Sequence, residues 1–204
     1  MNTNLLIVLV GAICFNVSTI AIGQTKTSQN TKMSVLPHVL FETKLGEIEV
    51  ELNSDNAPIS CRNFLMYVKS GMYDNGRFHR TVTMQNQPDK KIKIDVIQAG
   101  PKPGSKERKP IKLERTSVTG IKHLDGTVSM ARDKPDSATC DFLICIGDQP
   151  ELDFGGKRNP DGQGFGAFGR VVKGMEVVRA IQSGQSKEQV LTPPVVILSV
   201  KPIH

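Results

Sequence analysis

The sequence predicts a mainly β protein, a β-barrel or sandwich closed by helices. Three observations predict this class: many short segments with strand character, two amphipathic segments with helical periodicity, and loops rich in glycine and proline. The length of 204 residues suits one well-buried domain and is short for two domains of ordinary size. No internal repeat is evident in the chain.

The first 23 residues are expected to be an export signal. Apolar and small residues run without interruption from Leu5 to Phe15, and Ala21 and Gly23 provide the small residues of a signal-peptidase site before Gln24. We therefore expect an exported, periplasmic protein. The leader has no Lys or Arg and the whole stretch is uncharged, so an uncleaved anchor in the cell envelope is the alternative.

A flexible linker is predicted over residues 24–36, which are rich in Thr, Ser and Gln, and a folded domain over residues 37–204. The domain begins with two strands within residues 38–53, around a turn at Gly46, because aliphatic residues alternate with glutamates in the second half. A helix is predicted next, over residues 58–71. It has proline in its first turn, apolar residues at helical spacing and glycine at its end.

Six further strands and a second helix are predicted in the rest of the domain. The strand segments are short and bounded by turn-forming residues. They are Phe78–Val82, Ile92–Gln98, Thr127–Ala131, Phe142–Ile146, Ala167–Val172 and Val195–Lys201. The helix is predicted over Met175–Gln182, where Val177, Val178 and Ile181 fall on one side.

The formal net charge of +6 is concentrated in one stretch of the chain. Residues 85–116 carry nine basic and four acidic side chains, a net of +5. Such a patch attracts nucleic acid or acidic membrane surfaces in some proteins. This chain has few aromatic residues and no Trp. We therefore expect a solvated loop surface and no nucleic-acid partner, with membrane contact only if the signal is not cleaved.

Cysteine and histidine usage indicates neither a disulfide framework nor a metal site. Loss of Cys14 with the signal leaves three cysteines, which we expect to be buried thiols. The four histidines lack the spacing of zinc ligands. The "GFGAFG" segment at residues 164–169 fits a dinucleotide-binding pattern, but it does not open a helix. No cofactor and no metal are therefore expected.

A series of segments, in a fixed order, carries the functional signal. They are "FHR" at Phe78, "VIQAG" at Val96, "GTVSMAR" at Gly126, "DSATCDFLI" at Asp136, "LD" at Leu152 and "AFGRVVKGMEVV" at Ala167. From about Val39 to Val200 this order resembles the cyclophilins, the peptidyl-prolyl cis-trans isomerases. The resemblance implies a closed eight-stranded antiparallel β-barrel capped by two α-helices, and an enzyme that isomerises X-Pro bonds.

The resemblance also implies catalytic roles for three residues. Arg80 matches the catalytic arginine of the family, Gln98 the glutamine that orients it, and His79 a residue that lines the same site. An arginine suits the reaction because a prolyl bond passes through a twisted state that regains a lone pair on the prolyl nitrogen. A fixed hydrogen-bond donor aimed at that nitrogen stabilises the twisted state over either planar ground state.

Further residues are implied in substrate binding. They are Val96, Leu143, Leu152 and Phe165 in an apolar pocket for the proline ring, and Ala131, Arg132 and Asp141 along the peptide groove. The chain also departs from the family pattern, with Asp95, Asp141 and Glu151 where the family usually has Phe, Gln and an aromatic residue. An insertion between Arg80 and Val96 carries several lysines. We expect a shallower and more polar pocket, in which Asp141 pairs with Arg80 and either orients it or withdraws its donors.

The partners expected from the resemblance are proline-containing polypeptides, above all unfolded exported proteins, bound by a monomer. Two functional hypotheses follow. The first is an active exported isomerase that assists protein folding. The second is a module of the same fold that binds proline segments, as a chaperone does, with little turnover.

Overall fold

A computed structural model of the chain describes Met1 and residues 36–203. The predicted signal and linker therefore lie outside the described residues, apart from Met1 and Leu36. None of the described helices is both long and apolar enough to cross a bilayer.

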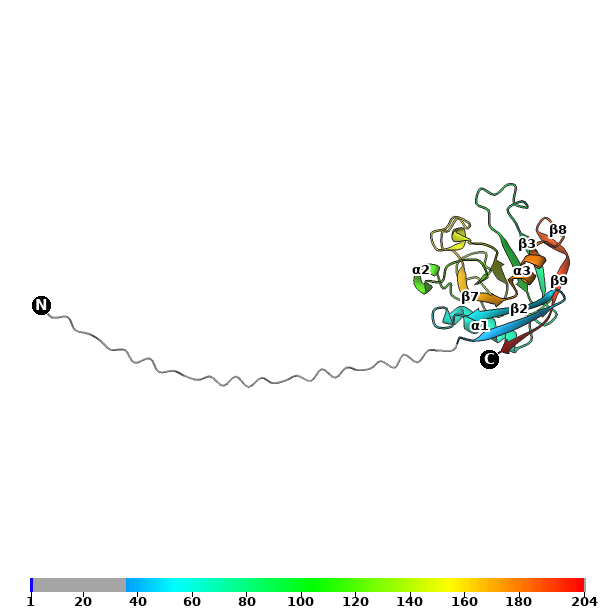
Figure 1. Ribbon diagram of the computed structural model, residues 1–204, viewed down its shortest axis with the longest axis horizontal. Helices are drawn as coiled ribbons and strands as arrows, with labels where there is room; N and C mark the ends of the chain where they lie inside the picture. The colour runs from blue at the N-terminus through cyan, green and yellow to red at the C-terminus, as the bar shows by residue number, and fades with distance from the viewer. Residues whose placement is uncertain (2–35, 204) are drawn as a thin grey trace. The chain divides into compact units, whose positions relative to one another are not determined.

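Eight antiparallel strands close into a barrel (Figure 1). Their order around the barrel is β1-β2-β7-β5-β6-β4-β3-β9, and β9 pairs with β1 to complete the ring. The strands are β1 (His38–Thr43), β2 (Gly46–Leu52), β3 (Arg77–Val82), β4 (Val96–Gly100), β5 (Thr127–Met130), β6 (Phe142–Cys145), β7 (Gly166–Lys173) and β9 (Val190–Ile203). A short β8 (Ser186–Lys187) pairs only with β9. The predicted closed eight-stranded barrel is confirmed.

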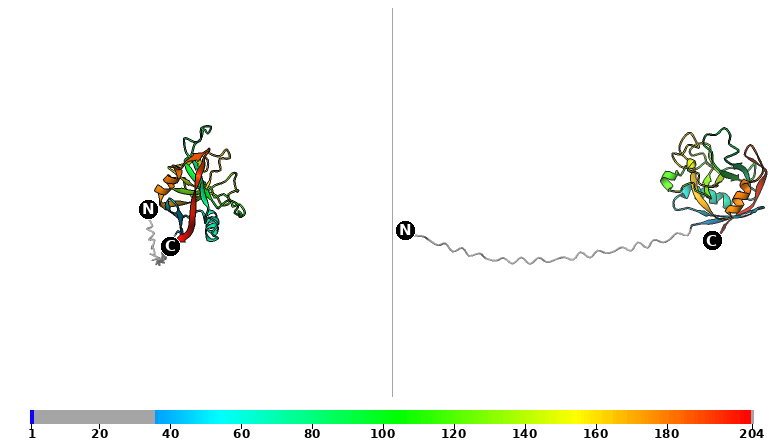
Figure 2. Two further views of the ribbon diagram at one scale, coloured as in Figure 1. Left: turned by 90° about the vertical axis from the view of Figure 1, so that its right-hand side faces the viewer. Right: turned by 45° about the horizontal axis from the view of Figure 1, so that its top comes forward.

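Both predicted helices pack against the barrel (Figure 2). The first, α1 (Pro58–Lys69), buries its apolar face next to β7 and β9. The second, α3 (Met175–Gln182), lies against β2, β3 and β4 and buries the three predicted aliphatic residues. Two shorter elements were not predicted: a single helical turn, α2 (Thr116–Thr119), and a 3₁₀ turn, η1 (Pro150–Leu152).

The barrel core is built around an aromatic cluster. The ring of Phe142 lies 5.5 Å from the rings of Phe41 and Phe64, 5.6 Å from Tyr73 and 6.2 Å from Phe78. All five side chains are fully buried. Since burial of each large apolar side chain contributes about 1.5–3 kcal/mol, this cluster is a main source of the stability of the barrel.

The strand predicted at Ile92–Gln98 is shifted in the structure. β4 begins at Val96 and ends at Gly100, so residues 92–95 belong to the loop after β3. There the side-chain amide of Gln87 donates to the carbonyl oxygen of Ile94 at 2.8 Å, in place of a neighbouring strand. The backbone of this stretch thus bonds to a side chain and not to a strand, a difference that the periodicity of apolar residues cannot predict.

Candidate active site

A β-bulge in β3 turns two neighbouring side chains toward the same surface. The register of β3 shifts between Phe78 and Arg80 against both β4 and β9. Phe78 is fully buried in the barrel, whereas His79 and Arg80 are both only partly buried. In a regular strand adjacent residues point to opposite faces, so the bulge is what allows His79 and Arg80 to share one face.

Two glutamines hold the guanidinium of Arg80. Arg80 lies directly opposite Gln98 across the β3–β4 pair, and its Nη1 donates to Gln98 Oε1 at 3.1 Å. On the other edge, Nε and Nη2 donate to Gln189 Oε1 at 3.1 and 2.6 Å. A guanidinium has five N–H donors. These bonds use three, which leaves one N–H on Nη1 and one on Nη2 for a ligand.

Asp141 acts on Arg80 through Gln98. The amide Nε2 of Gln98 donates to Asp141 Oδ2 at 3.0 Å, which leaves the amide oxygen of Gln98 to accept from Arg80. His79 Nε2 lies 3.5 Å from the same carboxylate oxygen. The predicted direct pair between Asp141 and Arg80 is wrong, because no described ion pair joins them. Instead the carboxylate sets which end of the Gln98 amide faces Arg80.

Gly100 makes room for this arrangement. A Cβ on Gly100 would collide with Asp141 Oδ1. The absence of a side chain at this position of β4 therefore lets the Asp141 carboxylate lie against the strand and reach Gln98.

Beside Arg80, a second apolar cluster lies apart from the barrel core. It contains all four side chains predicted for the proline pocket, together with three others: Val82, Ile94, Val96, Leu143, Cys145, Leu152 and Phe165. The cavity above it measures about 760 Å³. The residues that line it include Arg80, Ile94, Val96, Gln98, Ala131, Arg132, Asp141, Leu143, Arg158 and Phe165. Leu152 is fully buried within the cluster and does not line the cavity. His79, which was expected to line the site, does not line the cavity either, but its Nε2 contacts Asp141, which does.

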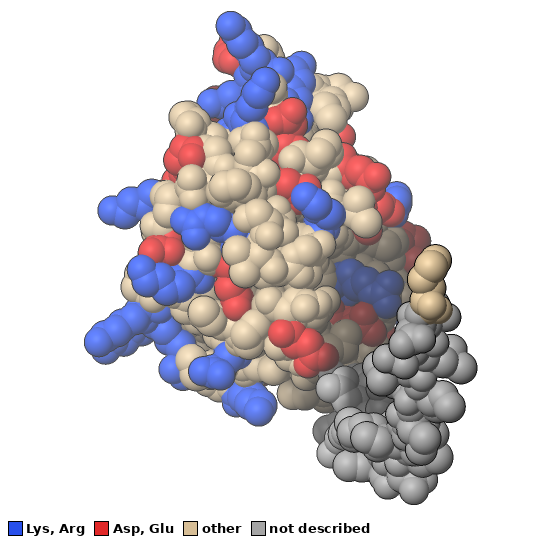
Figure 3. Space-filling view, turned by 90° about the vertical axis from the view of Figure 1, so that its left-hand side faces the viewer, with Lys and Arg blue, Asp and Glu red and all other residues tan. Residues whose placement is uncertain are grey.

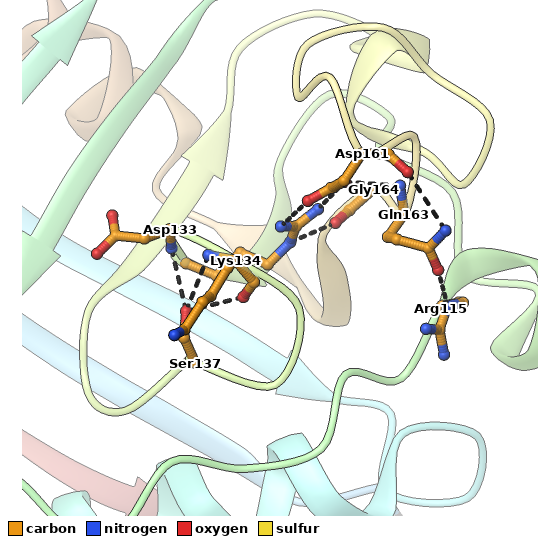
Figure 4. Close-up of polar contacts among 8 residues, drawn as sticks. Arg115, Asp133, Lys134, Ser137, Asp161, Gln163 and Gly164 are labelled. Atoms are coloured by element: carbon orange, nitrogen blue, oxygen red, sulfur yellow. Dashed lines mark hydrogen bonds and ion pairs between the residues drawn. The ribbon is translucent and has the colours of Figure 1, made fainter.

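Arg132 shapes the wall of the cavity at Phe165. Its Nη1 and Nη2 donate to the two carboxylate oxygens of Asp161 at 2.7 and 2.9 Å, and its Nε donates to the carbonyl oxygen of Gly164 at 2.7 Å. The guanidinium lies 5.1 Å from the ring centre of Phe165. Figure 4 shows Asp161 and Gly164 opposite the loop 133–137. The hydrogen bonds from Arg132 lower the pKa of Asp161 to about 2, so this contact persists at neutral pH.

Several site residues were not predicted from the sequence, among them Gln189, Ile94 and Arg158. Gln189 comes from the β8–β9 turn, 109 residues after Arg80, and no local pattern links the two. Ile94 enters the apolar cluster one position before Asp95, which does not line the cavity. Arg158 lies in the loop after η1 and lines the cavity beside the insertion.

Comparisons with known proteins identify the family. The profile described as "Cyclophilin type peptidyl-prolyl cis-trans isomerase/CLD" matches residues 38–202. Peptidyl-prolyl cis-trans isomerase A of Dickeya dadantii is 37% identical over 170 residues, which cover 80% of this chain and 83% of that protein.

The chain belongs to the cyclophilins.

Other relatives agree with this placement. Peptidyl-prolyl cis-trans isomerase B of Escherichia coli is 38% identical over 149 residues, covering 71% of this chain and 83% of that protein. A crystal structure of a cyclophilin from Cryptosporidium parvum matches the fold with a TM-score of 0.68 at 21% identity, over 83% of this chain and 99% of that one. A structure of the same parasite protein in the presence of the dipeptide Ala-Pro gives a TM-score of 0.65. This cyclophilin is accordingly a peptidyl-prolyl cis-trans isomerase.

This cyclophilin also contains a buried Ser-His-Asp chain that resembles a hydrolase triad. His123 Nε2 lies 3.0 Å from Ser129 Oγ, and His123 Nδ1 lies 2.8 Å from Asp153 Oδ1. Ser129 is completely buried, and it does not line the cavity at Arg80. A nucleophile must reach its substrate, so these three residues form a structural network. Among residues 36–203, no three His, Cys, Asp or Glu side chains gather in a way that would hold a metal ion.

Proposed function

We propose that Arg80 catalyses prolyl isomerisation by donating a hydrogen bond to the prolyl nitrogen in the twisted transition state. The observation that carries this proposal is the fixed guanidinium. Gln98 and Gln189 hold it by opposite edges, and two N–H groups remain for the substrate. A donor fixed in advance needs no reorganisation when the lone pair develops, which favours the transition state over the ground state.

The surroundings of Arg80 strengthen such a hydrogen bond. Burial lowers the pKa of Arg80, although the guanidinium stays charged because its ordinary pKa is far above neutrality. A charge-assisted hydrogen bond is stronger in a partly desolvated groove than in water. The apolar cluster with Val96, Leu143 and Phe165 would receive the proline ring next to this donor. The Ala-Pro dipeptide used with the Cryptosporidium cyclophilin is a ligand of the class that this pocket would accept.

Substitution of Arg80 tests the mechanism. Arg80→Ala should lower kcat/KM by about a hundredfold to a thousandfold, equivalent to roughly 3–4 kcal/mol of transition-state stabilisation. Arg80→Lys should restore little, because an ammonium group cannot bond both glutamines and the substrate in one plane. The measurement is the cis-to-trans conversion of a proline tetrapeptide, with circular dichroism as the control for folding.

Two outcomes would change the assignment. An Arg80→Ala protein that isomerises as fast as the parent would remove this role for Arg80. A parent protein that binds proline peptides but shows no rate above background would instead favour the binding module, which holds proline segments without turning them over.

We further propose that the enzyme acts as a monomer on unfolded proteins in the periplasm. The apolar run from Leu5 to Phe15 and the small residues before Gln24 support export with removal of the first 23 residues. Intact mass of the exported protein should correspond to a chain that begins at Gln24. Recovery of the full-length chain in the membrane fraction would support the anchor in its place, and sedimentation velocity of the mature protein reports its oligomeric state.

A further inference from the structure

Two loops form a cationic wall along the cavity that holds Arg80. The first loop joins β3 to β4 (residues 83–95), and the second follows η1 (residues 153–165). Their side chains at the cavity are Lys90, Lys91, Ile92, Ile94, Lys157, Arg158, Asn159 and Pro160. The first loop rises beyond the barrel at the top of Figure 1, and Lys and Arg side chains gather at the same end in Figure 3.

The wall is held in place by Gln87. This side chain is 2% exposed, and its Nε2 donates to the carbonyl oxygens of Thr83 and Ile94 at 2.7 and 2.8 Å. Its Oε1 accepts from Arg158 Nη1 at 2.7 Å, which joins the two loops. The position of Arg158 is therefore set before any ligand arrives, and binding there does not require the wall to be ordered first.

Arg158 lines the cavity and has side-chain donors without a hydrogen-bond partner. Both of its hydrogen bonds, to Gln87 and to the carbonyl oxygen of Ile92 at 2.8 Å, come from Nη1. The three N–H groups on Nε and Nη2 have no partner among the described residues, and the ion pairs found there do not include Arg158. Nε and Nη2 form the edge of a guanidinium that binds a carboxylate through two parallel hydrogen bonds.

The electrostatic setting favours an anion at this edge. Burial lowers the pKa of Arg158, and the positive charge of Arg80 lowers it further. Two half-buried guanidinium groups thus repel each other in one groove, and a ligand carboxylate would relieve this repulsion. The side-chain amide nitrogen of Asn159 on the same wall is buried without a hydrogen-bond partner, a costly state for a donor unless an acceptor reaches it.

We infer that Arg158 binds the carboxylate of an acidic residue within two positions of the substrate proline, so that the enzyme prefers acidic proline segments. The inference rests on the proposed function of Arg80 in the same cavity. Lys90, Lys91 and Lys157 add positive potential along the path of the peptide. An acidic residue gains a paired hydrogen bond at Arg158, whereas a lysine at that position meets the positive charge of Arg158 and Lys157. The carboxylates of Glu107, Asp133 and Asp141 also line the cavity, but they are not on these two loops.

Capped peptides with one Ala-Pro bond test this preference. Glu, Gln or Lys is placed immediately before Ala-Pro in one series and immediately after it in another, and kcat/KM is measured by exchange NMR on the full mature protein. In at least one series, kcat/KM for the Glu peptide should exceed that for the Gln peptide by about tenfold at low salt. This ratio of kcat/KM values should fall toward about threefold in 0.5 M salt. Salt screens the exposed lysine charges more than it screens the partly buried contact at Arg158.

Variants at Arg158 separate recognition from loop structure. Arg158→Gln should bring the Glu to Gln ratio to about one, and Arg158→Glu should reverse it in favour of the Lys peptide. If the substitution only disordered the wall, kcat/KM would fall by the same factor for all peptides. The ratio of kcat/KM between the Glu and Gln peptides would then be unchanged. Arg62→Gln removes one arginine from the exposed side of α1, away from the cavity, and should keep the tenfold ratio.

The possible results are distinguishable. A ratio of one in both series for the parent enzyme, or a tenfold ratio that survives Arg158→Gln, would overturn the role of Arg158 while isomerase activity continues. No isomerisation of any peptide would overturn the proposed function of Arg80; calorimetry with the Glu and Gln peptides would then still test Arg158 as a carboxylate site through their dissociation constants.

Discussion

Arg80 depends on a residue in a strained turn. Gln189 and its neighbour Glu188 connect β8 to β9 with φ angles of 73° and 49°, the left-handed region that glycine adopts most easily. Gln189 holds this conformation while its side chain receives two hydrogen bonds from Arg80 and donates one to the carbonyl oxygen of Asn86 at 3.1 Å. Stability of the turn alone would favour glycine at this position, so the glutamine is explained by its contact with Arg80.

Gln189→Gly should separate activity from stability. The substitution removes the backbone strain at this position, so the free energy of unfolding should stay within about 1 kcal/mol of the parent. It also removes the hydrogen bonds that hold one edge of the Arg80 guanidinium, so kcat/KM should fall by about tenfold. Glu188→Gly is the matched control. It relieves the same turn at an exposed side chain and should leave kcat/KM at the parental value. Equal activities of the two variants would show that Arg80 does not need Gln189.

Gly100→Ala should disturb catalysis from a position that does not touch Arg80. The added methyl group would displace the Asp141 carboxylate, which then loses its bond to Gln98. We expect kcat/KM to fall by about threefold to tenfold, with KM changed less than kcat. In the double variant Gly100→Ala with Asp141→Ala, the decreases in kcat/KM from the two substitutions should not add, because both substitutions act through Gln98. Additive losses in this cycle would contradict the proposed link.

Part of this site is predictable from the residue pattern. The order of "FHR" and "VIQAG" brings Arg80 and Gln98 together, because adjacent antiparallel strands place them opposite each other. The bulge at His79 is not predictable, since the apolar Phe78 and the polar pair after it also fit a regular strand end. The partnership of Arg80 with Gln189 spans 109 residues and depends on closure of the barrel.

At the scale of elements, the loop over residues 83–95 differs most from the prediction. The charge of this segment predicts a solvated surface for its lysines, and its residue pattern predicts a strand over Ile92–Asp95. In the structure two of these lysines line the cavity, and Ile94 packs into the apolar cluster. Composition identifies the charge of such a loop but not the surface against which it folds. The barrel strands are easier to predict, because alternation of apolar and polar residues indicates a strand with one buried face.

Gln87→Ala should release this loop without unfolding the barrel. The variant loses hydrogen bonds to Thr83, Ile94 and Arg158, and leaving buried groups unpaired costs about 1–3 kcal/mol. Trypsin should then cleave after Lys90 or Lys91 much faster than in the parent, as mass spectrometry of timed digests would show. Gln85→Ala, at an exposed neighbouring glutamine, should be cleaved at the parental rate. Identical digests of all three proteins would refute the role of Gln87.

At the scale of the whole molecule, buried polar groups join segments that the barrel ladders do not connect. The carboxylate of Asp153, after η1, accepts from the backbone N–H of His123 at 3.2 Å and lies 2.8 Å from its ring nitrogen, while the same ring contacts Ser129 on β5. Burial acts to raise the pKa of Asp153, but the hydrogen bonds from His123 outweigh it and the pKa is lowered. The ionised carboxylate is therefore the form that stabilises the fold.

Asp153→Asn should lower the free energy of unfolding by about 1–3 kcal/mol at pH 7, because it removes the charged acceptor for His123. A lowered folded-state pKa gives stability that is fully present above the unfolded value of about 3.9 and is lost as pH falls through the folded value. The difference in the free energy of unfolding between parent and variant should thus be constant from pH 7 to 5 and become smaller below about pH 4. Urea unfolding at several pH values measures it. Asp89→Asn, at an exposed carboxylate, is the control, and a gap that widens in acid would contradict the assignment.

Val82 pairs with Val96 in the β3–β4 ladder, so the two ends of the 83–95 loop leave and re-enter the barrel at adjacent positions. The length and composition of this loop can drift over evolutionary time without a compensating change in any strand, because the ring closes elsewhere, through β1 and β9. Arg80 and Gln98 lie within that ladder and are bound by its geometry. The 83–95 loop places Lys90 and Lys91 at the cavity. We therefore expect a relative with other residues at these two positions to keep the Arg80–Gln98 pair while the charge at the cavity changes.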